Sequence, residues 1–195
     1  MNLLLTSANL NCQYRSKSYI DSFNRLEVFS SLFSNIFLVE TVSYEDCDYL
    51  KEFKYKKFFS NIGNPFAEKG YNWARHMENF LNLTPEEHFI FLTGRYKILN
   101  DNLIKFASDN QNCKIIAKND KDIYSGNGVH MFYFYFQKSE LLKFLHEVLS
   151  SKDKSCPIEW KFKNFISKSK DCVELPINFN LGVETDISNG IVMKV

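Results

Sequence analysis

The residues best suited to chemistry form a short polar turn, Thr93-Gly94-Arg95, which follows an apolar run from His88 to Leu92. The run has the length and the aromatic and β-branched content of a buried strand. The turn supplies a hydroxyl, a glycine that allows close approach to the backbone, and a fixed cation. Ligands of open α/β sheets bind beyond the carboxyl ends of strands, and a guanidinium matches phosphate oxygens. The triplet fits a phosphate site and, equally well, an ordinary turn followed by a surface arginine.

Polar residues also follow the other strands expected early in the chain. A strand over 2–7 ends in Thr6 and Ser7, with Asn9 just beyond it. A second strand over 36–39 closes with Glu40, an acid at the position that can accept a hydrogen bond from a ribose hydroxyl. Each signal is weak alone, because capped loops have the same composition.

A third group of polar residues surrounds the start of a helix expected over 67–83. Asn64 lies in the turn before it, and Lys69 and Gly70 lie at its start, where free backbone N–H groups favour anions. One helix face is apolar, and the opposite face carries Asn72, Arg75, His76 and Asn79. We expect this polar face to be solvated unless it lines a ligand site.

Acidic residues offer candidates for a metal ion and for a general base. Asp120 and Asp122 form a D-x-D triplet on the polar loop 118–128, where a metal site and a solvated turn both remain open. Asp46 and Asp48 form another, which we discount because acids in a first helical turn favour the helix dipole. Glu159, after Pro157 at the start of a late helix, is either such a first-turn acid or a general base.

The composition fits one compact domain. The chain has 195 residues, of which 45% are apolar, and strand and helix patterns alternate along it. This order predicts the α/β class, with a mixed, mostly parallel central sheet and helices on both faces. Ser18-x-x-Asp21 and Ser139 are expected to cap helices. The strand expected over 129–136 is aromatic on both sides, which favours a covered strand over an RNA-stacking surface.

Several functional classes are disfavoured. The net charge of +1 gives no global field for nucleic acid, and the five cysteines are scattered without a C-x-x-C pair. The apolar run 3–5 is too short for a signal peptide or a membrane span, so we expect a cytoplasmic protein, or one peripheral to a membrane, with no transmembrane segment. Motifs of P-loop ATPases, dinucleotide enzymes, zincins and α/β-hydrolases are absent.

Taken together, these elements resemble the small GT-A-like glycosyltransferases that build bacterial surface polysaccharides and glycans of large DNA viruses. Several members carry a Lys-Leu-Thr-Gly-Arg-Tyr string after a helix that begins near Lys-Gly. The matching segments here are Phe91-Leu92-Thr93-Gly94-Arg95-Tyr96 after Lys69-Gly70-Tyr71-Asn72, then Ile158-Glu159, and finally Leu181-Gly182-Val183 with Gly190 downstream.

The resemblance implies a single GT-A-like (Rossmann-like) domain over 1–195, with a nucleotide-sugar-binding half (1–118) and an acceptor-side half (119–195). It implies transfer of a sugar from a nucleotide-diphosphate sugar to a hydroxyl of a glycan or lipid-linked glycan, with inversion. Thr6, Ser7 and Glu40 would hold the base and ribose, and Lys69, Arg75 and Arg95 would surround the diphosphate. The remaining substrate-binding residues would be Asn9, Asn64, Gly70, Thr93 and Gly94. Glu159 would be the base, and Arg95 would stabilise the leaving group.

The chain departs from the family in its metal motif. Ordinary GT-A enzymes place a D-x-D at the end of the central strand, where it binds Mn²⁺ or Mg²⁺, and here that position reads Thr93-Gly94-Arg95. Either cations replace the metal, or Asp120 and Asp122 hold it, and the basic residues favour a metal-independent site. The alternative function is a non-catalytic nucleotide- or glycan-binding module on the same fold.

Overall fold

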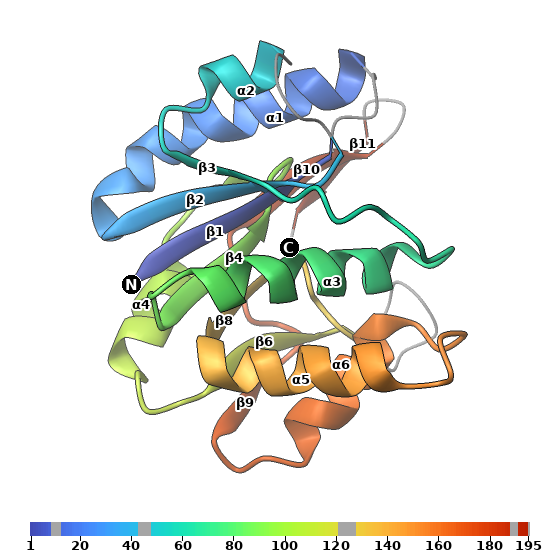
Figure 1. Ribbon diagram of the computed structural model, residues 1–195. Coiled ribbons are helices and arrows are strands. Elements are labelled where there is room, and N and C mark those ends of the chain that lie inside the picture. Colours follow the sequence, from blue (N-terminus) through green and yellow to red (C-terminus); the bar gives the residue numbers. More distant parts are fainter. Residues whose placement is uncertain (9–12, 43–47, 121–127, 188–190, 195) are drawn as a thin grey trace.

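A computed structural model describes residues 1–8, 13–42, 48–120, 128–187 and 191–194. Its central sheet has eight strands in the order β3-β2-β1-β4-β8-β6-β7, with β9 paired to β6 (Figure 1). The first four strands of this order, β3, β2, β1 and β4, are mutually parallel, and β8 runs antiparallel to β4 and β6. The bounds are β1 Asn2–Ser7, β2 Asn35–Glu40, β3 Lys56–Phe59, β4 His88–Thr93, β6 Ile115–Asp120, β7 Gly128–Val129, β8 Tyr133–Gln137 and β9 Cys172–Leu175.

Helices cover both faces of this sheet, so the predicted fold class is confirmed. One apolar core joins the sheet to α1, α2 and α4, and a second joins it to α3, α5 and α6, which lie in front of the sheet in Figure 1. The two cores form because apolar residues of the inner strands point alternately to the two faces. The helices are α1 Gln13–Leu26, the 3-10 helix η1 Glu27–Leu32, α2 Asp48–Glu52, α3 Lys69–Leu83, α4 Asn102–Asp109, α5 Lys138–Ser150 and α6 Ile158–Ser167.

The tail of the chain returns to the segment that follows Thr93-Gly94-Arg95. Strands β11 (Ile191–Lys194), β10 (Val183–Ile187) and β5 (Lys97–Ile98) form a second small sheet in that order. The carbonyl of Gly182 accepts a hydrogen bond from the Leu99 N–H at 2.7 Å. Gly182 has φ +65°, and a Cβ there would lie 2.0 Å from Asn100 Oδ1, so this close return requires glycine.

Three local predictions were wrong. Ser18 does not open a helix: α1 begins at Gln13, and Ser18 is buried inside it. Ser139 lies within α5, which begins at Lys138 directly after β8, and no side-chain cap bond is made there. The aromatic run 129–136 is divided between β7 and β8. Serine caps are local signals, whereas the packing of the element against the sheet decides where a helix begins.

None of the helices among the described residues is both long and apolar enough to span a bilayer.

Candidate functional site

The strand order reverses at β1, which lies between β2 and β4 and is parallel to both. In open α/β sheets ligands bind at the carboxyl ends of the strands that flank such a reversal. Thr6 and Thr93 occupy paired positions there, and the Gly94 N–H donates to the Thr6 carbonyl at 2.8 Å. The fold therefore places the Thr93-Gly94-Arg95 turn at the edge where open α/β sheets bind their ligands.

Gly94 is required by the packing of the chain itself. A Cβ at this position would lie 2.7 Å from the Thr6 carbonyl oxygen and 3.2 Å from the Tyr19 ring. Real Cβ atoms do not approach backbone oxygen so closely, and Gly94 is buried. The glycine is explained as a close-packed turn residue, which leaves Thr93 and Arg95 as the members of the triplet with side chains for a ligand.

Glu40 is the most constrained acid at this edge. Its side chain is 1% exposed, and its Oε2 accepts hydrogen bonds from Ser7 Oγ at 2.6 Å and Tyr49 Oη at 2.5 Å. Its Oε1 accepts from the Val42 N–H at 2.9 Å. A buried carboxylate is tolerated only with such donors. The structure thus brings together Ser7 and Glu40, as predicted, and adds Tyr49 of α2, which the sequence pattern did not single out.

Positive charge gathers around Tyr19, which lies beside this acid. The Tyr19 hydroxyl accepts a hydrogen bond from the Ala8 N–H at 3.1 Å. Burial raises the pKa of Tyr19, while that hydrogen bond and the charges of Arg15 and Arg95 act in the opposite direction. Both arginines therefore act on the Tyr19 hydroxyl, which is bonded to the residue that follows β1. Arg15 was missed in the sequence, where its place soon after the first strand was the available signal.

The polar face of α3 is half-exposed at Asn72, Arg75 and Asn79, but the expectation that it is solvated was wrong for His76, which is turned toward the protein. His76 is 1% exposed, and its Nδ1 lies 2.8 Å from Ser60 Oγ, just beyond β3. Its Nε2 lies 2.9 Å from Asn64 Oδ1. Burial, with the charge of Arg75, lowers the pKa of His76. His76 is tolerated inside the protein because Ser60 and Asn64, which follow β3, give both of its ring nitrogens a hydrogen-bond partner.

The N-termini of α3 and α6 lie side by side. A Cβ on Gly70 would lie 2.4 Å from Ile158 Cγ2, so glycine at this position is needed for helix packing. Lys69 and Glu159, the neighbours of these two residues, are both exposed. The structure therefore places a cation and the predicted base on neighbouring helix N-termini, on the α3 side of the sheet.

The two residues predicted to be catalytic come from opposite faces of the sheet. Arg95 acts on Tyr19, which belongs to the core on the α1 side, whereas Glu159 stands on α6, which covers the other face. They can meet only across the carboxyl edge. Asn9, Asp122 and the side chain of Asp120 lie outside the described residues; in the remainder, no three His, Cys, Asp or Glu side chains are grouped to hold a metal ion.

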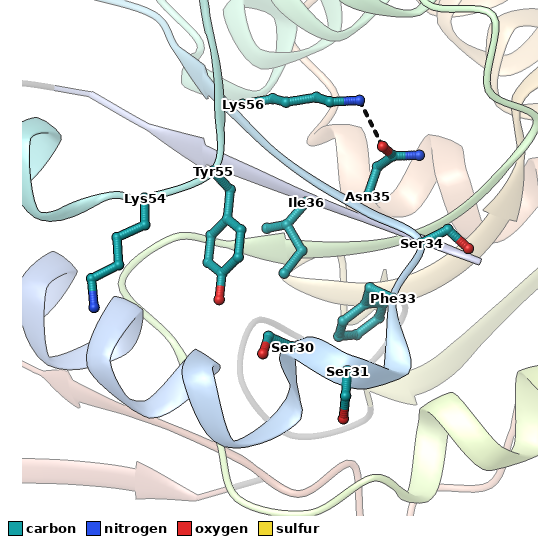
Figure 2. Close-up of a pocket in the computed structure, with 9 residues that line it drawn as sticks. All are labelled: Ser30, Ser31, Phe33, Ser34, Asn35, Ile36, Lys54, Tyr55 and Lys56. Carbon is teal, nitrogen blue, oxygen red and sulfur yellow. Dashed lines mark hydrogen bonds between the residues drawn. The ribbon is translucent and has the colours of Figure 1, made fainter.

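A depression of about 560 Å³ lies at the amino ends of β2 and β3, opposite the carboxyl ends that carry the candidate site (Figure 2). Asn35 and Lys56, which begin β2 and β3, line it, and Lys56 Nζ donates to Asn35 Oδ1 at 2.6 Å. Lys54, on its rim, pairs with Glu27. Its position at the amino ends of the strands separates it from every residue predicted to bind substrate.

Comparison with known proteins supports the fold. No protein-family model matches the chain, and no curated protein matches its sequence. A solved structure from Desulfovibrio desulfuricans G20, provisionally assigned as a nucleotide-diphospho-sugar transferase, is similar over 90% of this chain and 79% of its own, with TM-score 0.59 and 11% identity. HddC from Yersinia pseudotuberculosis is similar over 91% of each chain, with TM-score 0.53 and 12% identity. This likeness shows the fold, which is the GT-A-like, Rossmann-like α/β fold that the family resemblance implied.

Proposed function

We propose that this chain is a glycosyltransferase that moves a sugar from a nucleotide-diphosphate sugar to a hydroxyl of a glycan acceptor. The observation that carries the proposal is the composition of the carboxyl edge at the β1–β4 reversal. A buried acid, Glu40, lies there, and the charges of two arginines, Arg15 and Arg95, act on Tyr19 beside it. An acid suits ribose hydroxyls and guanidinium groups suit phosphate oxygens. The likeness to a protein assigned as a nucleotide-diphospho-sugar transferase supports the same ligand class.

The chemistry follows from the charges at this edge. Arg95 would neutralise the diphosphate, with Lys69 and Arg75 approaching from the α3 side, while Thr6, Ser7 and Glu40 would hold the base and ribose. In an inverting reaction the acceptor oxygen bonds to the sugar's anomeric carbon as the bond from that carbon to the phosphate oxygen breaks. The diphosphate leaves with the electron pair, and the acceptor proton passes to the Glu159 carboxylate.

We further propose that cations perform the role that a metal ion has in other enzymes of this fold. Thr93-Gly94-Arg95 offers a guanidinium and a hydroxyl where a carboxylate pair would be needed, and this donor set does not suit Mn²⁺ or Mg²⁺. Asp120 and Asp122 are the acids that would hold a metal if one is used. If cations replace the metal as proposed, a double variant, Asp120→Asn with Asp122→Asn, should leave donor binding unchanged both with Mn²⁺ and with EDTA.

The first test is a thermal-shift panel of UDP-, GDP-, CMP- and dTDP-sugars, each with Mn²⁺ and with EDTA. A donor at about 100 times its Kd stabilises the fold by roughly 2.7 kcal/mol. For a domain of this size the melting temperature should rise by about 5–10 °C. A shift that survives EDTA supports a cationic site. No shift with any donor contradicts the proposal.

Turnover is then measured as release of the nucleotide product with the donor that binds. Arg95→Ala should lose both affinity and rate, and Glu159→Gln should lose rate while the donor still binds. Glu147→Gln, on an exposed position of α5, is the matched control and should behave as wild type. Binding without any turnover would instead assign the chain as a nucleotide- or glycan-binding module.

A further inference from the structure

A chain of hydrogen bonds crosses the carboxyl edge from α3 to β2, with His76 at its centre. Asn79 Nδ2 donates to Ser60 Oγ at 3.1 Å, and Ser60 Oγ lies 2.8 Å from His76 Nδ1. On the other side of the ring, His76 Nε2 lies 2.9 Å from Asn64 Oδ1. Asn64 Nδ2 reaches the Thr41 carbonyl at 3.4 Å. The ring therefore links a helix, the end of a strand and the turn that follows it.

The chemistry of these partners determines where the imidazole carries its proton. Asn64 Oδ1 can only accept, so His76 Nε2 must be the donor. In a neutral ring Nδ1 then accepts, and the Ser60 hydroxyl donates to it. Asn79 fills a lone pair of the same hydroxyl. Every group in the chain thus has one role, and a second proton on the ring would place two donors face to face unless Ser60 turned away.

The link continues into the proposed nucleotide site. Thr41 donates to the Ser7 carbonyl through its N–H at 3.0 Å and through its Oγ1 at 3.1 Å. Ser7 Oγ in turn donates to Glu40. The Ser60 N–H donates to the Glu40 carbonyl at 2.9 Å. The strand ends that hold Glu40 are therefore tied from one side by the turn that His76 anchors.

We propose that His76 is a positioning residue: neutral and protonated on Nε2, it holds the turn that carries Asn64 against Thr41 and so keeps the nucleotide-binding edge formed. The effect on donor binding rests on the function proposed above, whereas the effect on the turn does not. Asn64, predicted to contact substrate, acts here through the backbone of Thr41.

The electrostatic surroundings agree with a neutral ring. Arg75 on α3 and Glu40 on β2 are the charged groups that act on His76, while Ser60, Asn64 and Asn79 are uncharged. Burial, with the repulsion of Arg75, lowers the pKa of His76, and Glu40 opposes this weakly. The ring therefore stays neutral at pH 7 and gains its proton only below the ordinary histidine range.

Two variants separate the two nitrogens of the ring. The Gln side chain places an amide N–H near the position of Nε2, so His76→Gln keeps the bond to Asn64. The Asn side chain places an oxygen near Nδ1, so His76→Asn keeps only the bond to Ser60. Asn64→Ala removes the Nε2 bond from its other end and should reproduce His76→Asn. Nitrogen NMR of the wild-type imidazole reads the tautomer directly and needs no variant; a protonated Nδ1 at pH 7 would overturn the proposal.

Amide hydrogen exchange measures the turn without any ligand. Exchange at Thr41 and Ser60 should be about tenfold faster in His76→Asn, because a lost partner leaves a buried group unsatisfied. It should stay within about twofold of wild type in His76→Gln, and Gly94, on the far side of β1, should not change in either. Equal exchange in wild type and both variants, or equally fast exchange in both variants, would overturn the proposal.

Donor affinity provides the functional readout. For the nucleotide sugar that stabilises wild type, His76→Asn should bind about tenfold more weakly and His76→Gln about as well as wild type. If wild type binds no donor, the proposed function fails, and hydrogen exchange still decides the role of His76. If wild type binds and both variants bind equally well, the positioning role fails.

Discussion

Removing one hydroxyl, that of Tyr49, should destabilise the fold measurably. In Tyr49→Phe the ring keeps its stacking on Tyr19, at 4.7 Å between centroids, while the hydrogen bond to Glu40 is lost. That bond is 2.5 Å long, and both residues are 1% exposed. A hydrogen bond to a charged group contributes about 1.5–3 kcal/mol. We expect the free energy of unfolding to fall by about 2 kcal/mol and the melting temperature by about 4–8 °C.

The assay is urea unfolding, with Tyr19→Phe as the matched control. That variant loses a hydroxyl that accepts a hydrogen bond from the Ala8 N–H, a neutral pair, and should lose only about 1 kcal/mol. A double-mutant cycle with Glu40→Gln tests the charge directly, and Tyr49 and Glu40 should show a coupling of at least about 1 kcal/mol. If Tyr49→Phe is as stable as Tyr19→Phe, or if the cycle is additive within about 0.5 kcal/mol, the assignment of Glu40 as a buried, donor-stabilised carboxylate is refuted.

Three further variants or conditions test the packing of the edge, each by urea unfolding. Gly94→Ala should lower the free energy of unfolding by about 1–3 kcal/mol, because its Cβ would meet the Thr6 carbonyl at 2.7 Å. Unchanged stability would show that β1 shifts without strain to make room for the Cβ. Gly70→Ala and Ile158→Ala should each lower the free energy of unfolding. In the double variant the loss should be smaller than the sum of the two single losses by at least about 1 kcal/mol, because the smaller side chain at 158 makes room for the new Cβ. Simple additivity would argue against the close contact between the two helices. Stability should also fall as the pH drops below about 6.5, because burial lowers the pKa of His76 and the unfolded state therefore binds a proton that the folded state resists. His76→Gln should lose part of this pH dependence. A pH profile identical to that of wild type would contradict the prediction.

The strands that build the site were predictable because their signals are local. Asn2–Ser7, Asn35–Glu40 and His88–Thr93 are short apolar runs bounded by polar residues, and each became a strand within one or two residues of its expected bounds. Parallel strands place their carboxyl ends at one edge. The position of Glu40 at the end of the second strand therefore followed from the sequence alone.

Roles that depend on partners distant in the chain were not predictable. The polar face of α3 looked solvated, and His76 became buried because Ser60 and Asn64 meet it from β3 and the following turn. Tyr49 gave no local signal for its bond to Glu40, since the helix that carries it is defined by its apolar face. Arg15 was passed over for the same reason: it lies four residues before Tyr19 on α1, and only the packing of that helix brings the pair to the end of β1.

The sequence by itself determined the α/β class, the strands, and the polar residues that reach the carboxyl edge, because hydrophobic periodicity and turn residues act over short distances. The tertiary structure decided which of these residues meet. It turned Gly94 and Gly70 into packing residues, set Arg95 and Glu159 on opposite faces, and surrounded Glu40 with donors. Those outcomes depend on the layering of helices on the two faces of the sheet, a property of the whole chain that no short stretch of residues contains.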